Sequence, residues 1–207
     1  MSKKLGSSYW KLWTATAISN LGDGVSMVAY PWLASAVTRS PILIAAAGFA
    51  SRLPWLIFTL HAGVLTDRFD RRKLIVAMDF MRGVLTVFVG LVVFFNRDSF
   101  PALDELTTIK NLETNWPIYF TLLVTAFLFG LAEVLRDNSA QTLMPSVVDK
   151  ENLEKANGRM WSAESLTNSF IGPPLGSLLI GIAIFIPFFF DAVSFFFAVA
   201  LIASLKG

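Results

Sequence analysis

The sequence GVLTDRFDRRK occupies residues 63–73, and the reading of the whole chain starts from it. On both sides of it lie apolar runs that are long enough to span a membrane. Two membrane helices joined by a short charged turn must enter the membrane from the same side. Short loops rich in Lys and Arg stay in the cytoplasm, so the stretch predicts a helical hairpin whose turn is cytoplasmic. The basic residues behind this prediction are Arg68, Arg71, Arg72 and Lys73.

The spacing within this stretch goes beyond what a basic loop requires, since Gly63 and Asp67 stand at fixed distances from the basic residues. The order G-x-x-x-D-[R/K]-x-G-[R/K]-[R/K] is typical of the major facilitator superfamily of transporters, which this chain resembles. The variant D-R-x-D-R-[R/K]-K is similar to the branch that holds siderophore exporters and macrolide efflux proteins. The matching residues are Gly63, Asp67, Arg68, Arg71 and Arg72, whereas Asp70 stands where that superfamily usually has Gly.

The composition indicates a membrane protein with several spans. Of the 207 residues, 55% are hydrophobic and 15% are charged, against about 25% charged in a soluble domain. The mean hydropathy is +0.61, and the charges are clustered rather than spread. The net charge of +2 gives no reason to expect a nucleic-acid partner, and the lack of Cys excludes disulfides. No nucleotide-binding or hydrolase motif occurs, so we expect neither an enzyme nor a cofactor or metal.

The apolar runs predict an all-helical bundle of six membrane helices with both termini in the cytoplasm. The expected helices cover residues 10–36, 42–65, 74–95, 116–136, 157–180 and 187–205, with residues 137–155 lying along the membrane surface. Basic residues fall mostly on the predicted cytoplasmic side. Those assigned to it are Lys3, Lys4, Lys11, Arg68, Arg71, Arg72, Lys73, Arg136, Lys150, Lys155, Arg159 and Lys206, and those assigned outside are Arg39, Arg97 and Lys110.

The resemblance implies that residues 1–207 are the N-terminal half of a twelve-helix fold and that the second six-helix half is absent. Transport in this superfamily proceeds by rocking of two bundles about a site at the membrane midplane. The missing partner is either the second half or a second copy of this chain. The sequence does not distinguish a fragment from a split gene or a half-size protein that dimerises.

A polar stripe runs along the first predicted helix at spacings of three and four residues. It predicts a face that lines the bundle interior, with Asp23 as a carboxylate that takes up a proton or faces a cation. A structural hydrogen bond to a neighbouring helix is the equal alternative. Glu164 is the second candidate for proton coupling, and Asn168 lies one turn further along the fifth helix. The stripe consists of Thr16, Asn20, Asp23, Met27 and Tyr30.

Two acid–base pairs at helical spacing occur in the third and fourth helices. Asp79 and Arg82 are expected to pair with each other in a structural role. By resemblance, Glu133 and Arg136 join the loop around Asp67 in a cluster that holds an inner gate shut. The expected gating residues are Gly63, Asp67, Arg68, Arg71, Arg72, Glu133 and Arg136.

Small residues in the fifth helix predict a close helix contact. Gly172, Pro173 and Gly176 lie in the sequence GPPLG, which matches only the distal part of the glycine pattern of facilitator antiporters. We expect this face to pack against the second bundle, the alternative being packing within this bundle. Arg52 either contacts an anionic substrate or, as the favoured reading, extends to the outer interface. Asp191 is expected to make a structural hydrogen bond.

Together these features predict a secondary transporter in the bacterial cytoplasmic membrane. It would export a small amphipathic molecule such as a siderophore or a drug, with protons as the coupling ion. Its partners would be the lipid bilayer, the transported molecule, protons and a second bundle. The alternative is a half-bundle that does not transport and serves as a scaffold or an assembly unit.

Overall fold

The computed structural model describes residues 5–101, 105–109 and 111–205, and all regular structure within these ranges is helical. Some residues of the charge assignment, namely Lys3, Lys4, Lys110 and Lys206, lie outside the described residues. The long helices are α1 (Ser7–Val37), α2 (Pro41–Arg68), α3 (Arg71–Phe95), α4 (Trp116–Val147), α5 (Leu153–Ser165), α6 (Gly172–Ile182) and α7 (Ile186–Ala203). The short elements are η1 (Arg97–Ser99), η2 (Glu105–Thr107), η3 (Lys150–Asn152) and the π-helical turn η4 (Leu166–Ile171).

The helix ends follow from local sequence signals. Pro41 opens α2, where its missing N–H costs nothing because the first turn has no intrahelical acceptor for it. The side chain of Asp70 accepts a hydrogen bond from the backbone N–H of Lys73 at 2.9 Å and so caps α3. This explains why Asp is tolerated where the facilitator pattern has Gly. The predicted reversal between the last two helices is found at residues 183–185.

The fourth helix does not end where the sequence suggested. We expected an end near Arg136 and a surface segment after it, but α4 continues without a break to Val147. The reason is packing: Met144 is buried among Tyr9 of α1 and Ala156 of α5. The polar residues after Arg136 therefore extend the bundle instead of lying along the membrane surface.

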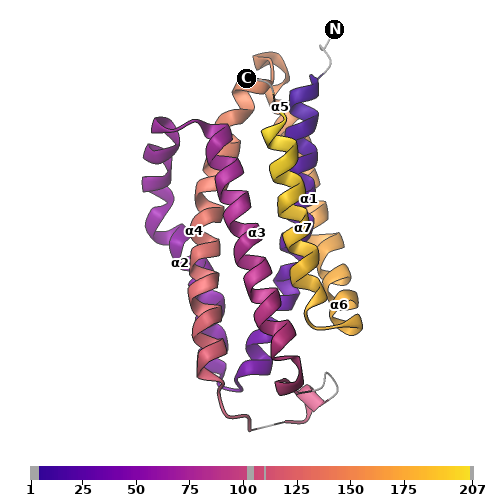
Figure 1. The fold of residues 1–207 in the computed structure, drawn as a ribbon. Helices are drawn as coiled ribbons and strands as arrows, with labels where there is room; N and C mark the ends of the chain where they lie inside the picture. Colours follow the sequence, from indigo (N-terminus) through magenta and orange to yellow (C-terminus); the bar gives the residue numbers. More distant parts are fainter. Residues whose placement is uncertain (1–4, 102–104, 110, 206–207) are drawn as a thin grey trace.

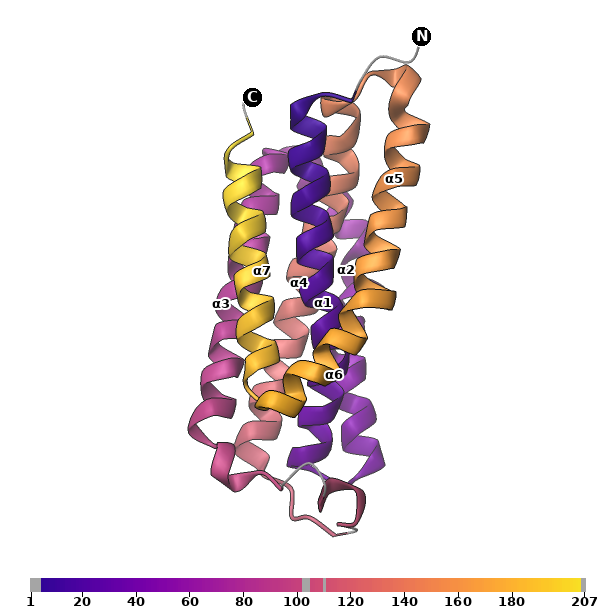
Figure 2. The ribbon, with the colours of Figure 1, turned by 90° about the vertical axis from the view of Figure 1, so that its right-hand side faces the viewer.

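The helix contacts follow an open arc rather than a closed ring. α2 packs on α4, α4 on α3, α3 on α7, and α7 on α1, while α1 packs on the rod made by α5, η4 and α6 (Figure 1). Figure 2 shows this rod beside α1, with α7 on the other side of α1. α1 makes little contact with α2, so a crevice is left between them. Along the helix axes, both termini and the α2–α3 turn lie at the same end of the bundle, the top in Figure 1.

Four helices of the described residues are long and apolar enough to cross a membrane: α2, α3, α4 and α7. α1 is long enough, with 31 residues, but its polar stripe lowers its hydropathy. The rod that packs on α1 consists of three parts, α5 with 13 residues, the π turn η4 with 6 and α6 with 11. The more polar and irregular segments, α1 and this rod, thus pack against each other, where a polar group has partners other than lipid.

Candidate functional site

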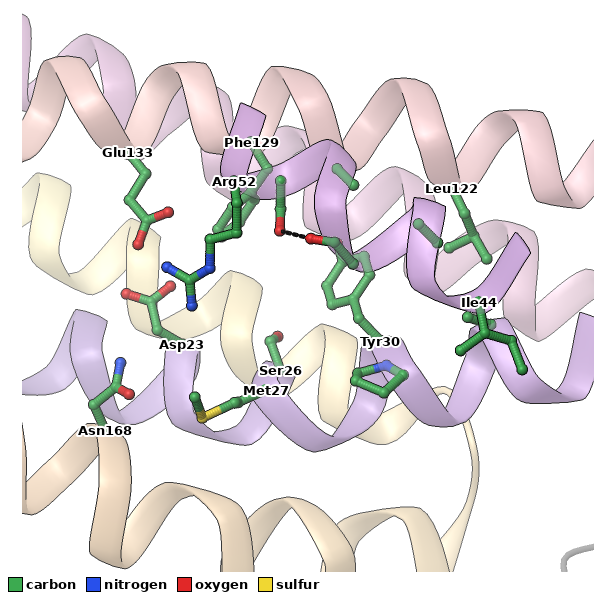
Figure 3. Close-up of a pocket in the computed structure, with 16 residues that line it drawn as sticks. Asp23, Ser26, Met27, Tyr30, Ile44, Arg52, Leu122, Phe129, Glu133 and Asn168 are labelled. Atoms are coloured by element: carbon green, nitrogen blue, oxygen red, sulfur yellow. Dashed lines mark hydrogen bonds between the residues drawn. The ribbon is translucent and has the colours of Figure 1, made fainter. Parts of the chain in front are cut away.

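A cavity of about 290 Å³ lies in the crevice between α1, α2 and α4 (Figure 3). Its lining combines apolar side chains, among them Met27, Leu122 and Phe129, with charged and hydroxyl groups. Such a mixed lining is typical of sites for small amphipathic molecules. The residues around it are Asp23, Ser26, Met27, Tyr30, Pro31, Ala34, Ile44, Ala47, Gly48, Ser51, Arg52, Leu122, Ala126, Phe129, Glu133 and Asn168.

Arg82 of α3 is the centre of a buried ion-pair network behind the cavity. Its side chain is 1% exposed and contacts Asp23 of α1 directly, while a second nitrogen lies 3.3 Å from an oxygen of Asp79. The rings of Phe129 and Phe195 lie 4.7 Å and 4.2 Å from the guanidinium carbon, in cation–π contact. The predicted pairing of Asp79 with Arg82 is confirmed. Its extension to Asp23 joins α1 to α3 at the cavity wall.

Arg136 of α4 continues this network. Its Nε lies 3.5 Å from Asp79, and its terminal nitrogens donate to Asp137 at 3.1 Å and to the hydroxyl of Thr16 at 3.1 Å. Cations and carboxylates therefore alternate from Asp23 through Arg82 and Asp79 to Arg136. Arg136 is 2% exposed, so it is a buried member of the bundle rather than a residue of a surface loop. It lies inside the bundle because Asp79, at 0% exposure, needs a second cation within reach.

Asp191 of α7 occupies a separate buried position. Its Oδ2 accepts a hydrogen bond from the hydroxyl of Ser26 at 2.5 Å, and its Oδ1 lies 3.4 Å from the hydroxyl of Ser194. The expected structural hydrogen bond to a neighbouring helix is confirmed, with α1 as that helix. Because Ser26 also lines the cavity, this bond fixes the cavity wall to α7.

The π turn η4 brings Asn168 to the cavity. Pro173 and Pro174 have no N–H, so the carbonyls four residues before them have no helical donor, and the chain widens into a π turn. Within the turn, the Asn168 side chain donates to the Asn20 side chain at 3.4 Å. Two predicted polar residues from α1 and from the fifth helix are therefore brought together.

The small-residue face of α6 packs inside this bundle. A Cβ on Gly172 would lie 2.5 Å from the Cα of Gly24, and one on Gly176 would lie 2.7 Å from the carbonyl oxygen of Val25. Both glycines are thus buried against α1. The expectation that Gly172 and Gly176 face a second bundle is wrong, because α1 already occupies the space that their missing side chains leave. Pro173 between them is partly buried.

A second pocket of about 410 Å³ lies toward the termini, between α1, α4 and α5. Thr16, Asn20, Asp137 and Glu164 line it, whereas Asp23, Met27, Tyr30 and Asn168 line the first cavity. The predicted set of cavity residues is therefore divided between two pockets. The reason is that the stripe on α1 runs the length of the helix, and the Asn20–Asn168 contact crosses it midway.

The predicted gating cluster does not assemble. Asp67 pairs with Arg71 at 3.7 Å on the exposed α2–α3 turn. Glu133 instead accepts a hydrogen bond from the indole of Trp55 at 3.3 Å beside the first cavity, and Arg136 belongs to the buried network. In the described residues, no hydrogen bond or ion pair joins Asp67 to Glu133 or Arg136. Spacing alone could not show that these groups lie at different depths.

The other predicted gating residues near the turn, Gly63, Arg68 and Arg72, make different contacts. The guanidinium of Arg72 donates from Nε to the backbone oxygen of Ile202 at 3.1 Å and also contacts that of Ala203. These carbonyls are at the end of α7, where a cation is favourable. Arg68 and Gly63 are in the last turns of α2, and an added Cβ on Gly63 would meet no atom within 4 Å.

From the sequence, one residue of α2, Arg52, is placed at the cavity only as the less favoured alternative, and another beside it, Trp55, is not named. Arg52 lines the cavity, and Figure 3 shows its guanidinium turned toward Asp23 and near Glu133. The favoured interpretation, that Arg52 extends to the outer interface, is therefore wrong. Trp55 is the hydrogen-bond donor to Glu133. A signal was present, because Gly48, Ser51 and Trp55 recur at helical spacing beside Arg52 and mark one less apolar face of α2.

Residues 6–207 match the profile of the family described as transmembrane secretion effector. The multidrug efflux pump Tap of Mycobacterium bovis and of Mycobacterium tuberculosis is 29% identical over 171 residues, which are 80% of this chain and 36% of the relative. Macrolide efflux protein A of Streptococcus pyogenes is 21% identical over 171 residues, 83% of this chain and 37% of the relative. The chain thus spans little more than a third of these relatives.

No solved structure matches the chain. The family match covers nearly all of it, and the four apolar helices agree with a multi-pass protein of the bacterial cell membrane. The matching family and the relatives are described as secretion and efflux proteins and not as enzymes. The chain belongs to the transmembrane secretion effector family, in the efflux branch of the major facilitator superfamily.

Proposed function

We propose that this chain is one bundle of a proton-coupled exporter that carries a small amphipathic molecule, such as a drug or siderophore, out of the bacterial cytoplasm. The names of its relatives, multidrug efflux pump and macrolide efflux protein, support the substrate class. The observation that carries the proposal is an amphipathic cavity whose wall contains Asp23, a carboxylate bound to a buried arginine.

The proposed topology has six membrane crossings with both termini in the cytoplasm. Four crossings are α2, α3, α4 and α7, and we assign the other two to α1 and to the rod of α5, η4 and α6. The basic α2–α3 turn lies at the same end as the termini, and short basic loops stay in the cytoplasm (Figure 1). The proposed membrane is the inner membrane, where a proton gradient is present.

Coupling follows from the position of Asp23 between the cavity and Arg82. A proton on the Asp23 carboxylate removes the charge that holds Arg82, which then stays bound to Asp79 alone. Protonation therefore neutralises the carboxylate in the cavity wall and, at the same time, breaks the ion pair that joins α1 to α3. Loss of the proton restores the ion pair. Glu164 lines the second pocket, toward the termini, and is the proposed site of proton exchange with the cytoplasm.

Transport by rocking needs a second bundle facing the crevice. Along this side several large apolar side chains are exposed, including Met27 at 52% and Phe49 at 58%. We propose that the second half of a longer transporter, or a second copy of this chain, covers them, while lipid covers the rest. In this arrangement the α2–α3 turn, with Asp67 and Arg71 at its surface, remains the proposed gating segment.

The test is drug accumulation in cells that express this chain, with and without a protonophore. We expect less accumulation of a macrolide than in control cells, reversal by the protonophore, and loss of the effect in Asp23→Asn, which keeps the side-chain volume. Efflux that Asp23→Asn leaves unchanged would exclude Asp23 as the coupling group. Protonophore-sensitive efflux from cells that express only this chain would exclude the alternative, a half-bundle that acts as a scaffold or an assembly unit.

A further inference from the structure

The polar groups around the first cavity are almost all engaged with the protein. Asp23 is bound to Arg82, and the hydroxyl of Ser26 donates to Asp191 at 2.5 Å. Three further side chains are also hydrogen-bonded: Ser51 donates to the Gly48 carbonyl at 3.0 Å, Asn168 donates to Asn20, and Glu133 accepts from Trp55. Groups satisfied in this way have little to gain from a ligand.

Two polar groups of the lining are exceptions: the buried hydroxyl of Tyr30, which has no hydrogen-bond partner in the described residues, and Arg52, which is the charged one of the two. Within the described parts of the chain Arg52 makes no hydrogen bond and no ion pair, although it carries a full positive charge. Figure 3 shows its guanidinium inside the cavity, turned toward Asp23 and near Glu133. Asp23 already has Arg82 as its counter-ion, so Asp23 does not neutralise the charge of Arg52.

The backbone that carries Arg52 is held firmly in place. A Cβ on Gly130 of α4 would collide with the carbonyl oxygen of Ser51, the residue next to Arg52, so the two helices touch backbone to backbone at this level. The ring of Pro54 also lies at this contact, 3.3 Å from the same Cβ position. A guanidinium on so fixed a base is a preorganised donor, and its planar fork fits the two oxygens of an acidic group.

The opposite part of the cavity fits an apolar body. Figure 3 shows Leu122 of α4 and Ile44 of α2 at the end away from Arg52, while Met27 and Phe129 add apolar surface beside the charged groups. A molecule with one acidic group at one end and a ring system at the other would satisfy both parts. Glu133 lies near Arg52, and its carboxylate would repel an anionic ligand. Removing the charge of Glu133 should therefore have the opposite effect on anion binding from removing the charge of Arg52.

We propose that Arg52 binds an acidic group where the transported molecule carries one, so that the cavity accepts, besides the drugs of the proposed function, amphipathic anions and zwitterions bearing a carboxylate or sulfonate. This inference rests on the proposed function, since it takes the same cavity as the substrate site. It assigns a specificity to that site, with Arg52 as the residue that determines it.

The experiment uses two fluorescent probes with the same aromatic body. Anilinonaphthalene sulfonate carries an acidic group and N-phenylnaphthylamine does not. Binding of each is titrated to the purified chain in nanodiscs of neutral lipid, with empty nanodiscs subtracted. The variants are Arg52→Gln, Glu133→Gln and, as a control for the loss of one positive charge elsewhere, Arg97→Gln, whose side chain is 49% exposed in the distant α3–α4 connection.

For the sulfonate we expect Arg52→Gln to weaken binding by about tenfold or more, the usual effect of losing a charge-assisted hydrogen bond. N-phenylnaphthylamine is expected to change less than twofold. Glu133→Gln is expected to strengthen sulfonate binding, a gain that misfolding cannot imitate, and Arg97→Gln to leave both probes unchanged.

Equal loss of both probes in Arg52→Gln, or an unchanged affinity for the sulfonate, would overturn the assignment of Arg52 and leave the cavity as a binding site. A different result concerns the proposed function itself. If the wild-type chain bound neither probe saturably, the cavity would not be a substrate site, and the inference would fail with it.

Discussion

Replacement of Arg82 by Gln is the perturbation that the structure predicts most sharply. The side chain is 1% exposed and is bound to two carboxylates. Asp79 keeps a cation after the change, because Arg136 lies 3.5 Å from it. Asp23 loses the one ion pair that it makes in the described residues, and Arg52, although turned toward it, forms no ion pair with it. Breaking one buried pair in this way costs roughly 3–5 kcal/mol, to which the two lost ring contacts add about 1 kcal/mol.

The assay is unfolding by sodium dodecyl sulfate in mixed micelles, followed by tryptophan fluorescence. Arg97→Gln is the matched control, since its pair with Asp98 at 3.8 Å is on the surface and its loss is expected to cost under about 1 kcal/mol. The double variant Asp23→Asn/Arg82→Gln is expected to be more stable than Arg82→Gln alone, because the uncompensated charge is gone. The reasoning is refuted if Arg82→Gln and Arg97→Gln lower the free energy of unfolding by the same amount.

Two further changes test the packing of α1, both in the same unfolding assay. Gly172→Ala is expected to cost roughly 1–3 kcal/mol, because its Cβ would press on the backbone of Gly24, whereas Gly181→Ala, which meets no atom within 4 Å, is expected to cost nothing; equal stability of the two variants would contradict the close contact. Ser26→Ala removes the short hydrogen bond to the buried Asp191 and is expected to cost about 1–3 kcal/mol, a result that full wild-type stability would rule out.

Much of the fold could be predicted from the sequence, because a lipid bilayer requires long apolar helices and favours basic residues in the cytoplasmic turns. Apolar runs and the basic turn at residues 63–73 were enough to find the all-helical class and the order of the helices. The end of α4 was not accessible. Its last turns are polar in sequence, and only contacts with Tyr9 and Ala156, residues remote along the chain, show why they stay helical.

The site was accessible only in part. Helical spacing placed Asp23, Met27 and Tyr30 on one face, and the structure puts all three around the cavity. Spacing within one helix does not reveal which helices meet, so the bond from Asp23 to Arg82 could not be foreseen. For the same reason the partner of Gly172 was misjudged, since the glycine stripe fits any close backbone and α1 was not known to be the neighbour.

The claim that the first cavity is the substrate site is tested most directly by substrate protection of single cysteines, since the chain has no Cys of its own. Ser51→Cys places a thiol at the cavity, and Ser177→Cys places one on the exposed side of α6. Both serines donate to a backbone carbonyl of their own helix, at 3.0 Å and 3.1 Å, which makes them matched positions. We predict that a macrolide slows modification by a thiosulfonate reagent at position 51 and not at position 177. Equal rates with and without the macrolide at position 51 would contradict the account.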